Sequence, residues 1–157
     1  MKAASPSDTP QGCTNLKLRQ LTRRVTQRYD VEVGKTGLKT TQYSLLSNVI
    51  RLGPLRPVDL AAVMRMTAST LSRNLQVLVA DGYVLLQAGP DARSRLVSVT
   101  EAGRAKRSEA QRHWKAAQLA LNMQLGEDRV VALHALLDQA LALLADADAD
   151  SEVAEDI

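Results

Sequence analysis

Apolar residues in the first third of the chain recur at the spacing of amphipathic helices. Over residues 14–33, leucine, valine and tyrosine alternate in helical register with lysine and arginine, and Gly34 and Gly37 follow as terminators. A second helix is predicted over 40–52, where a threonine is available as N-cap and Gly53 is followed by proline.

Two further helices are predicted before the pattern changes. Pro57 suits the first turn of a short helix over 58–64. Thr67 can cap a fourth helix over 68–80, and an Asp-Gly turn at 81–82 ends that helix.

The following segment has the period of β-strands. Residues 83–86 and 96–99 are predicted strands, and the intervening 88–94 is a turn rich in Gly, Pro and Asp. The order helix, short helix, turn, helix, hairpin is that of a winged helix-turn-helix. The pattern therefore predicts a mainly α fold with a small β-hairpin.

Two long helices complete the predicted elements. One starts at Thr100 and reaches about residue 125, and after Gly126 a last helix covers about 127–144. The acidic, low-complexity residues 146–157 and the Pro/Ser/Asp-rich residues 1–11 are expected to be disordered.

Composition excludes several classes of protein. With 157 residues, 45% apolar but only 3% aromatic, the chain can build one domain with an aliphatic core. It has no run of 18 apolar residues and no apolar N-terminal segment, so we expect a cytoplasmic protein without a membrane partner. Two histidines and one cysteine offer no metal-ligand spacing, and no phosphate loop or nucleophile–base pair is found. We expect no enzyme activity, cofactor or metal.

Charge is distributed unevenly along the chain. Residues 1–113 carry 18 Lys and Arg against 8 Asp and Glu, whereas residues 114–157 carry 2 against 9. This asymmetry fits a module that binds a polyanion and keeps its acidic end away from it. A charged, solvated surface is the alternative.

The fourth predicted helix has an apolar stripe and an acid-free polar face. Leu71, Leu75, Leu78 and Val79 form the stripe. Hydroxyl, amide and guanidinium groups suit phosphates and base edges in the major groove of double-stranded DNA. The candidate DNA-binding residues of this helix are Thr67, Ser69, Thr70, Ser72, Arg73, Asn74 and Gln76. By itself, this face is also compatible with an ordinary amphipathic helix.

The predicted hairpin decides between these interpretations. Its tip carries Arg93 and Arg95, and arginine is favoured in narrow, electronegative minor grooves. Asp91 is interpreted as an orienting partner of these arginines, with turn formation as the alternative role.

These residues resemble a known family of regulators. The run Asp91-x-Arg93-x-x-x-Val97-x-Val99-Thr100 is similar to the wing signature of the MarR (multiple antibiotic resistance regulator) family, with valine in place of the usual leucine at 99. Further similarities span roughly residues 13–145. They include Thr70-Leu71-Ser72-Arg73, Asp81-Gly82-Tyr83-Val84, Thr41-Gln42-Tyr43 and Thr100-Glu101-x-Gly103.

The resemblance implies a homodimer that binds a pseudo-palindromic operator, most simply as a repressor. The N- and C-terminal helices would then form the dimer, and the last helix is apolar around much of its circumference. The expected division is an arm over 1–11, dimerisation regions over 12–36 and 101–145, a DNA-binding lobe over 37–100, and a tail over 146–157.

The resemblance also suggests an input signal. Cys13 lies near the start of the first helix, where the helix dipole favours a thiolate, and some relatives sense peroxide through a cysteine in this region. Arg19 and Thr40, however, stand where those sensors carry tyrosine, so an incidental cysteine is the alternative. A small anionic aromatic or lipophilic effector is the other candidate signal. Its pocket would be lined by Tyr29, Tyr43, His113 and Trp114, which suit a structural core equally well.

A winged helix can also serve as a protein–protein interaction module that never touches DNA. Acidic residues on the fourth helix would be typical of that class, and the sequence has none from Thr67 to Ala80. The acid-free helix and the arginine-tipped hairpin favour a DNA-binding regulator.

Overall fold

The computed structural model describes residues 10–91 and 94–154 and divides into two compact units. The first unit ends at Ala117 and the second begins at Gln118, within helix α5. Most of the expected N-terminal arm, residues 1–9, lies outside the described residues.

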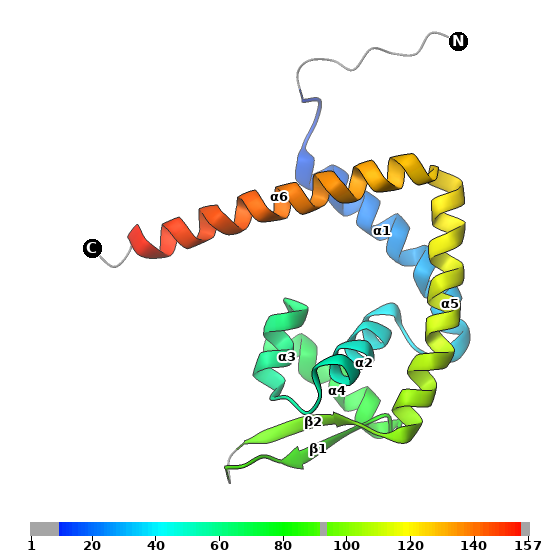
Figure 1. The fold of residues 1–157 in the computed structure, drawn as a ribbon, viewed down its shortest axis with the longest axis vertical. Helices are drawn as coiled ribbons and strands as arrows, with labels where there is room; N and C mark the ends of the chain where they lie inside the picture. Colours follow the sequence, from blue (N-terminus) through cyan, green and yellow to red (C-terminus); the bar gives the residue numbers. More distant parts are fainter. Residues whose placement is uncertain (1–9, 92–93, 155–157) are drawn as a thin grey trace. The chain divides into compact units, whose positions relative to one another are not determined.

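The first unit contains the four predicted helices in the predicted order (Figure 1). They are α1 (Thr14–Val33), followed by the 3-10 turn η1 (Gly34–Thr36), then α2 (Thr40–Leu52), α3 (Pro57–Met64) and α4 (Ala68–Ala80). Pro57 occupies the first turn of α3, where its missing N–H costs nothing, as predicted.

Two details at the junction of α1 and α2 correct the sequence prediction. Gly34 is helical, with φ −59°, and the chain first leaves helical geometry at Gly37, with φ 84°. The N-cap of α2 is Lys39 rather than a threonine. Asp30 instead accepts hydrogen bonds from the N–H and the hydroxyl of Thr40, at 3.0 and 2.7 Å, so a carboxylate from α1 satisfies the first turn of α2.

The hairpin is longer than predicted. Strands β1 (Val84–Ala88) and β2 (Arg95–Val99) are antiparallel, and Ala88 pairs with Arg95 at the edge of what was expected to be a turn. Leu55 adds a short bridge to the free side of β2, with hydrogen bonds to Val97 of 3.3 and 2.8 Å. The sequence pattern did not predict this bridge.

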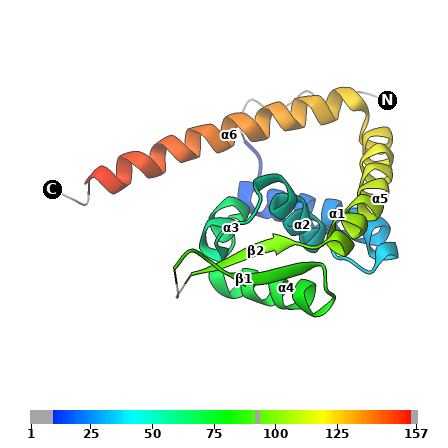
Figure 2. The same ribbon diagram turned by 60° about the horizontal axis from the view of Figure 1, so that its bottom comes forward.

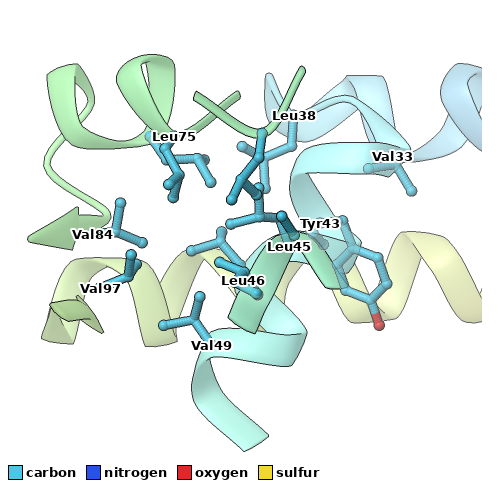
Figure 3. Close-up of a cluster of buried hydrophobic side chains, with 14 residues drawn as sticks. Val33, Leu38, Tyr43, Leu45, Leu46, Val49, Leu75, Val84 and Val97 are labelled. Carbon is cyan, nitrogen blue, oxygen red and sulfur yellow. The ribbon is translucent and has the colours of Figure 1, made fainter. Parts of the chain in front are cut away.

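The core of this unit is aliphatic and lies between the helices and the hairpin. Figure 3 shows side chains from α2, α4 and both strands converging on one cluster. Leu46, Leu75, Val84 and Val97 are almost fully buried in it. This packing positions the outer face of α4 and the hairpin on one rigid lobe, in which α4 runs beside the strands (Figure 2).

Helix α5 (Glu101–Leu125) begins one residue after the predicted start at Thr100, and Gly126, with φ 87°, separates it from α6. Helix α6 (Glu127–Ala154) continues ten residues beyond the predicted end at 144. Residues 146–154, which were expected to be disordered, are therefore helical, and 155–157 lie outside the described residues. The sequence 145–154 contains no Gly or Pro, and alanine favours helix strongly, which outweighs the acidic residues near the C-terminus. In the described ranges, no helix is long and apolar enough to cross a membrane.

Candidate nucleic-acid interface

Helix α4 buries the predicted leucine stripe and exposes its polar face. Leu71, Leu75 and Leu78 are buried, but Val79 is 36% exposed and does not belong to the stripe. The reason is geometric, because Val79 is turned by about 100° from Leu78 around a helix of 3.6 residues per turn. The side chain of Thr67 accepts a hydrogen bond from the N–H of Thr70 and caps the helix as predicted.

The candidate residues of α4 differ in how free their polar groups are. Ser69, Ser72, Arg73 and Gln76 are exposed. The hydroxyl of Thr67 lies 2.9 Å from that of Thr70 and 3.2 Å from that of Ser69, so its main role is to hold the first turn.

Asn74 is less available than its neighbours on the same face. It is half-buried, and its amide donates to the carbonyl of Thr70 at 2.9 Å. An asparagine that reads adenine uses both its donor and its acceptor, and this internal bond competes with that geometry.

The tip of the hairpin is only partly described. Arg95 is exposed on β2, whereas Arg93 and any contact between Arg93 and Asp91 lie outside the described residues. Asp91 does form the turn: its carbonyl accepts from the N–H and the hydroxyl of Ser94, at 3.0 and 3.1 Å. The main chain of Asp91 therefore takes part in the turn, and the role of its side chain stays a prediction.

A hydrogen-bonded junction fixes the base of the hairpin to α5. Thr100 donates its hydroxyl to the carbonyl of Gly82 at 2.7 Å and its N–H to the carbonyl of Tyr83 at 3.1 Å. The same hydroxyl accepts from the N–H of Gly103 at 2.9 Å, which caps α5. A Cβ on Gly103 would overlap the carbonyl of Tyr83, so only glycine allows this close approach.

Lys106 connects α5 to two segments that are distant in sequence, at Thr36 and at Tyr83. Its ammonium group donates to the carbonyl of Thr36 at 3.2 Å, pairs with Glu109 at 2.8 Å and lies 5.8 Å from the ring centroid of Tyr83. The hydrogen bond with Glu109 raises the pKa of Lys106 and lowers the pKa of Glu109. Sequence reasoning missed this residue, because no local pattern marks a contact across 70 positions.

The candidate effector-pocket residues lie in the same region of the first unit. The ring of Trp114 is 5.8 Å from that of Tyr29 and 6.2 Å from that of Tyr43, and both tyrosines are buried. Burial raises the pKa of Tyr29. His113 lies 3.6 Å from Glu32. The rings pack against one another as core side chains do, and their role in binding an effector stays a prediction.

Cys13 is an exposed, free cysteine at the N-cap of α1. Its carbonyl accepts from the N–H of Lys17 at 3.1 Å, which begins the helix. The predicted position is confirmed, and a sensing role stays a prediction. Among the described residues, no group of three His, Cys, Asp or Glu side chains is arranged to hold a metal ion.

The three-helix lobe with an antiparallel hairpin packed beside α4 defines a winged helix-turn-helix protein. A model of the MarR family matches residues 36–94. The Mycobacterium tuberculosis transcriptional regulator MosR, solved in complex with DNA, is 35% identical, with 82% of this chain and 96% of that chain covered and a TM-score of 0.69. The chain belongs to the MarR family of transcriptional regulators.

Two other comparisons agree with this assignment. A probable transcriptional regulator from Pseudomonas aeruginosa is 26% identical, with coverages of 81% and 96% and a TM-score of 0.74. The uncharacterised HTH-type regulator YwoH of Bacillus subtilis is 25% identical over 93 residues, which cover 59% of this chain and 68% of that protein.

Proposed function

We propose that this chain is a sequence-specific DNA-binding regulator whose α4 enters the major groove. The observation that carries the proposal is the face of α4: exposed serine, arginine and glutamine side chains without an acidic residue from Thr67 to Ala80. Such groups can donate to phosphates and to base edges. Arg95, exposed on the same rigid lobe, would reach the neighbouring backbone or minor groove together with Arg93.

Several relatives support a DNA partner and a repressor role. MosR was solved with DNA, a variant of Escherichia coli MarR with operator DNA, and CouR, described as a transcriptional repressor, with a 23-mer duplex. We extend DNA binding and repression to this chain. A regulator that acts on chromosomal DNA would work in the cytoplasm.

A homodimer is the form that this function requires. Two copies of α4, related by a two-fold axis, would bind half-sites about one DNA turn apart as a single event. Helix α6 supports this, because several of its large apolar side chains are more than half exposed in the single chain. They are Val131, Leu136, Leu141, Leu143 and Leu144.

Selection of bound genomic fragments tests the proposed function. The expected result is an enriched motif with two-fold symmetry, because a symmetric dimer reads a symmetric site. Arg93→Ala and Arg95→Ala should each reduce the slope of log K against log salt by about 1 per protomer, since each removes a phosphate neutralisation. Absence of any enriched fragment would overturn the proposal and favour a protein–protein interaction module.

Regulation by an oxidative or small-molecule signal is part of the proposal. If Cys13 is the sensor, its thiolate attacks hydrogen peroxide and the O–O bond breaks. Cys13 becomes a sulfenic acid, the hydroxide that leaves takes up a proton from solvent to form water, and affinity for the selected fragment changes. A Cys13→Ser variant should not respond to peroxide. Unchanged affinity with Cys13 still a free thiol would leave a small anionic or lipophilic effector, bound near Tyr29, Tyr43, His113 and Trp114, as the proposed signal.

A further inference from the structure

Arg65 has an unusual backbone conformation in the turn between α3 and α4. Its φ of 48° and ψ of 46° are left-handed, and among the described residues it is the only non-glycine with positive φ. The N–H of Arg65 donates to Ala62 at 3.1 Å and that of Met66 to Ala61 at 2.9 Å. These two bonds form a Schellman motif, in which the left-handed position is normally glycine because a Cβ is unfavourable there.

Nothing in the packing of the lobe explains an arginine at this position. The side chain of Arg65 is exposed, and within the described ranges it makes no ion pair. Arg56, at the other end of α3, differs because it donates to both carboxylate oxygens of Asp59, at 2.8 and 2.9 Å. Glycine or asparagine would adopt this backbone conformation at a lower cost, and the exposed side chain of Arg65 is free to make a contact outside the lobe.

The position of the turn indicates what that contact is. Arg65 precedes Thr67, the N-cap of α4, by two residues. In helix-turn-helix proteins the first helix crosses the DNA backbone while the N-terminal residues of the second contact base edges, so the turn between them passes over phosphates. No acidic residue occurs from Leu60 to Ala80 to repel a polyanion.

We propose that Arg65 binds a phosphate of the DNA backbone and that its left-handed conformation is retained for this contact. The proposal rests on the proposed function and adds a residue to the interface. Because phosphates are the same in every sequence, Arg65 contributes affinity and salt dependence but no sequence preference. Arg73 and Gln76, on the exposed face of α4, remain the candidates for base reading.

A test compares Arg65→Asn with the wild-type full-length chain in two measurements. The first is anisotropy of a labelled duplex of random sequence, about 30 base pairs long, titrated at several salt concentrations. The second is the melting temperature without DNA. Arg65→Lys keeps the charge, and Arg112→Gln removes an exposed arginine from α5 as a control for net charge.

The two measurements should move in opposite directions. Arg65→Asn should bind more weakly, with a salt slope smaller by about 1 per protomer, yet melt about 2–4 °C higher, because asparagine tolerates the left-handed region. Arg65→Lys should keep the slope, and Arg112→Gln should change neither quantity.

An unchanged slope for Arg65→Asn, with the wild type binding normally, would overturn the inference while leaving the proposed function intact. A lower melting temperature for Arg65→Asn would also overturn it, because the arginine would then be stabilising the turn. Absence of duplex binding by the wild type would overturn the proposed function and this inference with it.

Discussion

At the scale of single residues, the first turn of α4 depends on one hydroxyl group. Thr67 accepts the N–H of Thr70 and has two other hydroxyls close to it. Thr67→Ala should lower the free energy of unfolding by about 1 kcal/mol, measured by urea denaturation, because an N–H of the first turn loses its acceptor. Thr67→Ser keeps an acceptor and should behave like the wild type. Equal stability of the alanine and serine variants would contradict the capping role.

Gly103 lies too close to the hairpin base to accept a larger side chain. A methyl group there meets the carbonyl of Tyr83, so Gly103→Ala should cost about 1–3 kcal/mol of stability as the hairpin base shifts from α5. Gly34→Ala is the matched control, since Gly34 is helical and a Cβ at this position would have no atom within 4 Å. That variant should be neutral or slightly more stable. If Gly103→Ala had the same melting temperature as the wild type, the close approach of Gly103 to Tyr83 would not limit stability.

The sequence revealed residues that act through local patterns and missed those that act across the fold. Thr67, Pro57 and Gly126 were visible because caps and breakers follow rules of spacing. The bond from Asp30 to Thr40 was not, because it joins two helices, and neither was the left-handed conformation of Arg65, where glycine is the usual residue.

At the scale of elements, the pair formed by Lys106 and Glu109 gives a prediction about pH. The lowered pKa of Glu109 means that the pair stabilises the fold above the ordinary value of 4.5 and loses this effect as pH falls through the lowered pKa. The raised pKa of Lys106 means that the effect is also lost as pH rises beyond the ordinary value of 10.5.

Glu109→Gln should therefore melt below the wild type near neutral pH, by a small amount because the pair is partly solvated. The difference should disappear in acid below the lowered pKa of Glu109. Thermal melts of both proteins across this range measure it. A difference that stays constant with pH would mean that the carboxylate charge does not contribute.

Helix bounds were predicted well where Gly, Pro or a hydroxyl residue marks them, as at both ends of α4. The predicted end of α6 was wrong, because residues 145–154 combine alanine, which favours helix, with acidic residues, which are unfavourable near a helix C-terminus. In the structure the preference of alanine is the stronger of the two. The bridge between Leu55 and Val97 could not be predicted, because a pairing of one residue leaves no periodic signal. For the candidate interface, the sequence predicted the polar face of α4 but not the hydrogen bond of Asn74 to its own helix.

At the scale of the whole molecule, the proposed DNA recognition requires a second copy of the chain. Leu136 and Leu143 lie seven residues apart on one side of α6 and are 65% and 73% exposed. The double variant Leu136→Glu and Leu143→Glu should be monomeric by light scattering, because charge at an apolar contact that the proposed dimer would bury is strongly unfavourable. Its affinity for a symmetric fragment should fall. His134→Glu changes an exposed polar position that lies opposite Leu136 and Leu143 on α6 but on the side of Leu141. It should remain dimeric only where the interface is confined to the side of Leu136 and Leu143.

A monomeric wild type would contradict the dimer. A charged double variant that stays dimeric would place the interface on other apolar residues, such as Leu16 and Leu18 of α1, which are also exposed in the single chain.

The most direct test of DNA recognition by α4 and the hairpin compares two affinities of the wild type. One is for a selected genomic fragment, and the other is for a shuffled duplex of equal length. We expect a preference of about 10³-fold or more for the selected fragment, with log K falling linearly against log salt. Arg73→Ala should lose about 1–3 kcal/mol of that preference. Equal, salt-independent binding of both duplexes would contradict DNA recognition by this lobe.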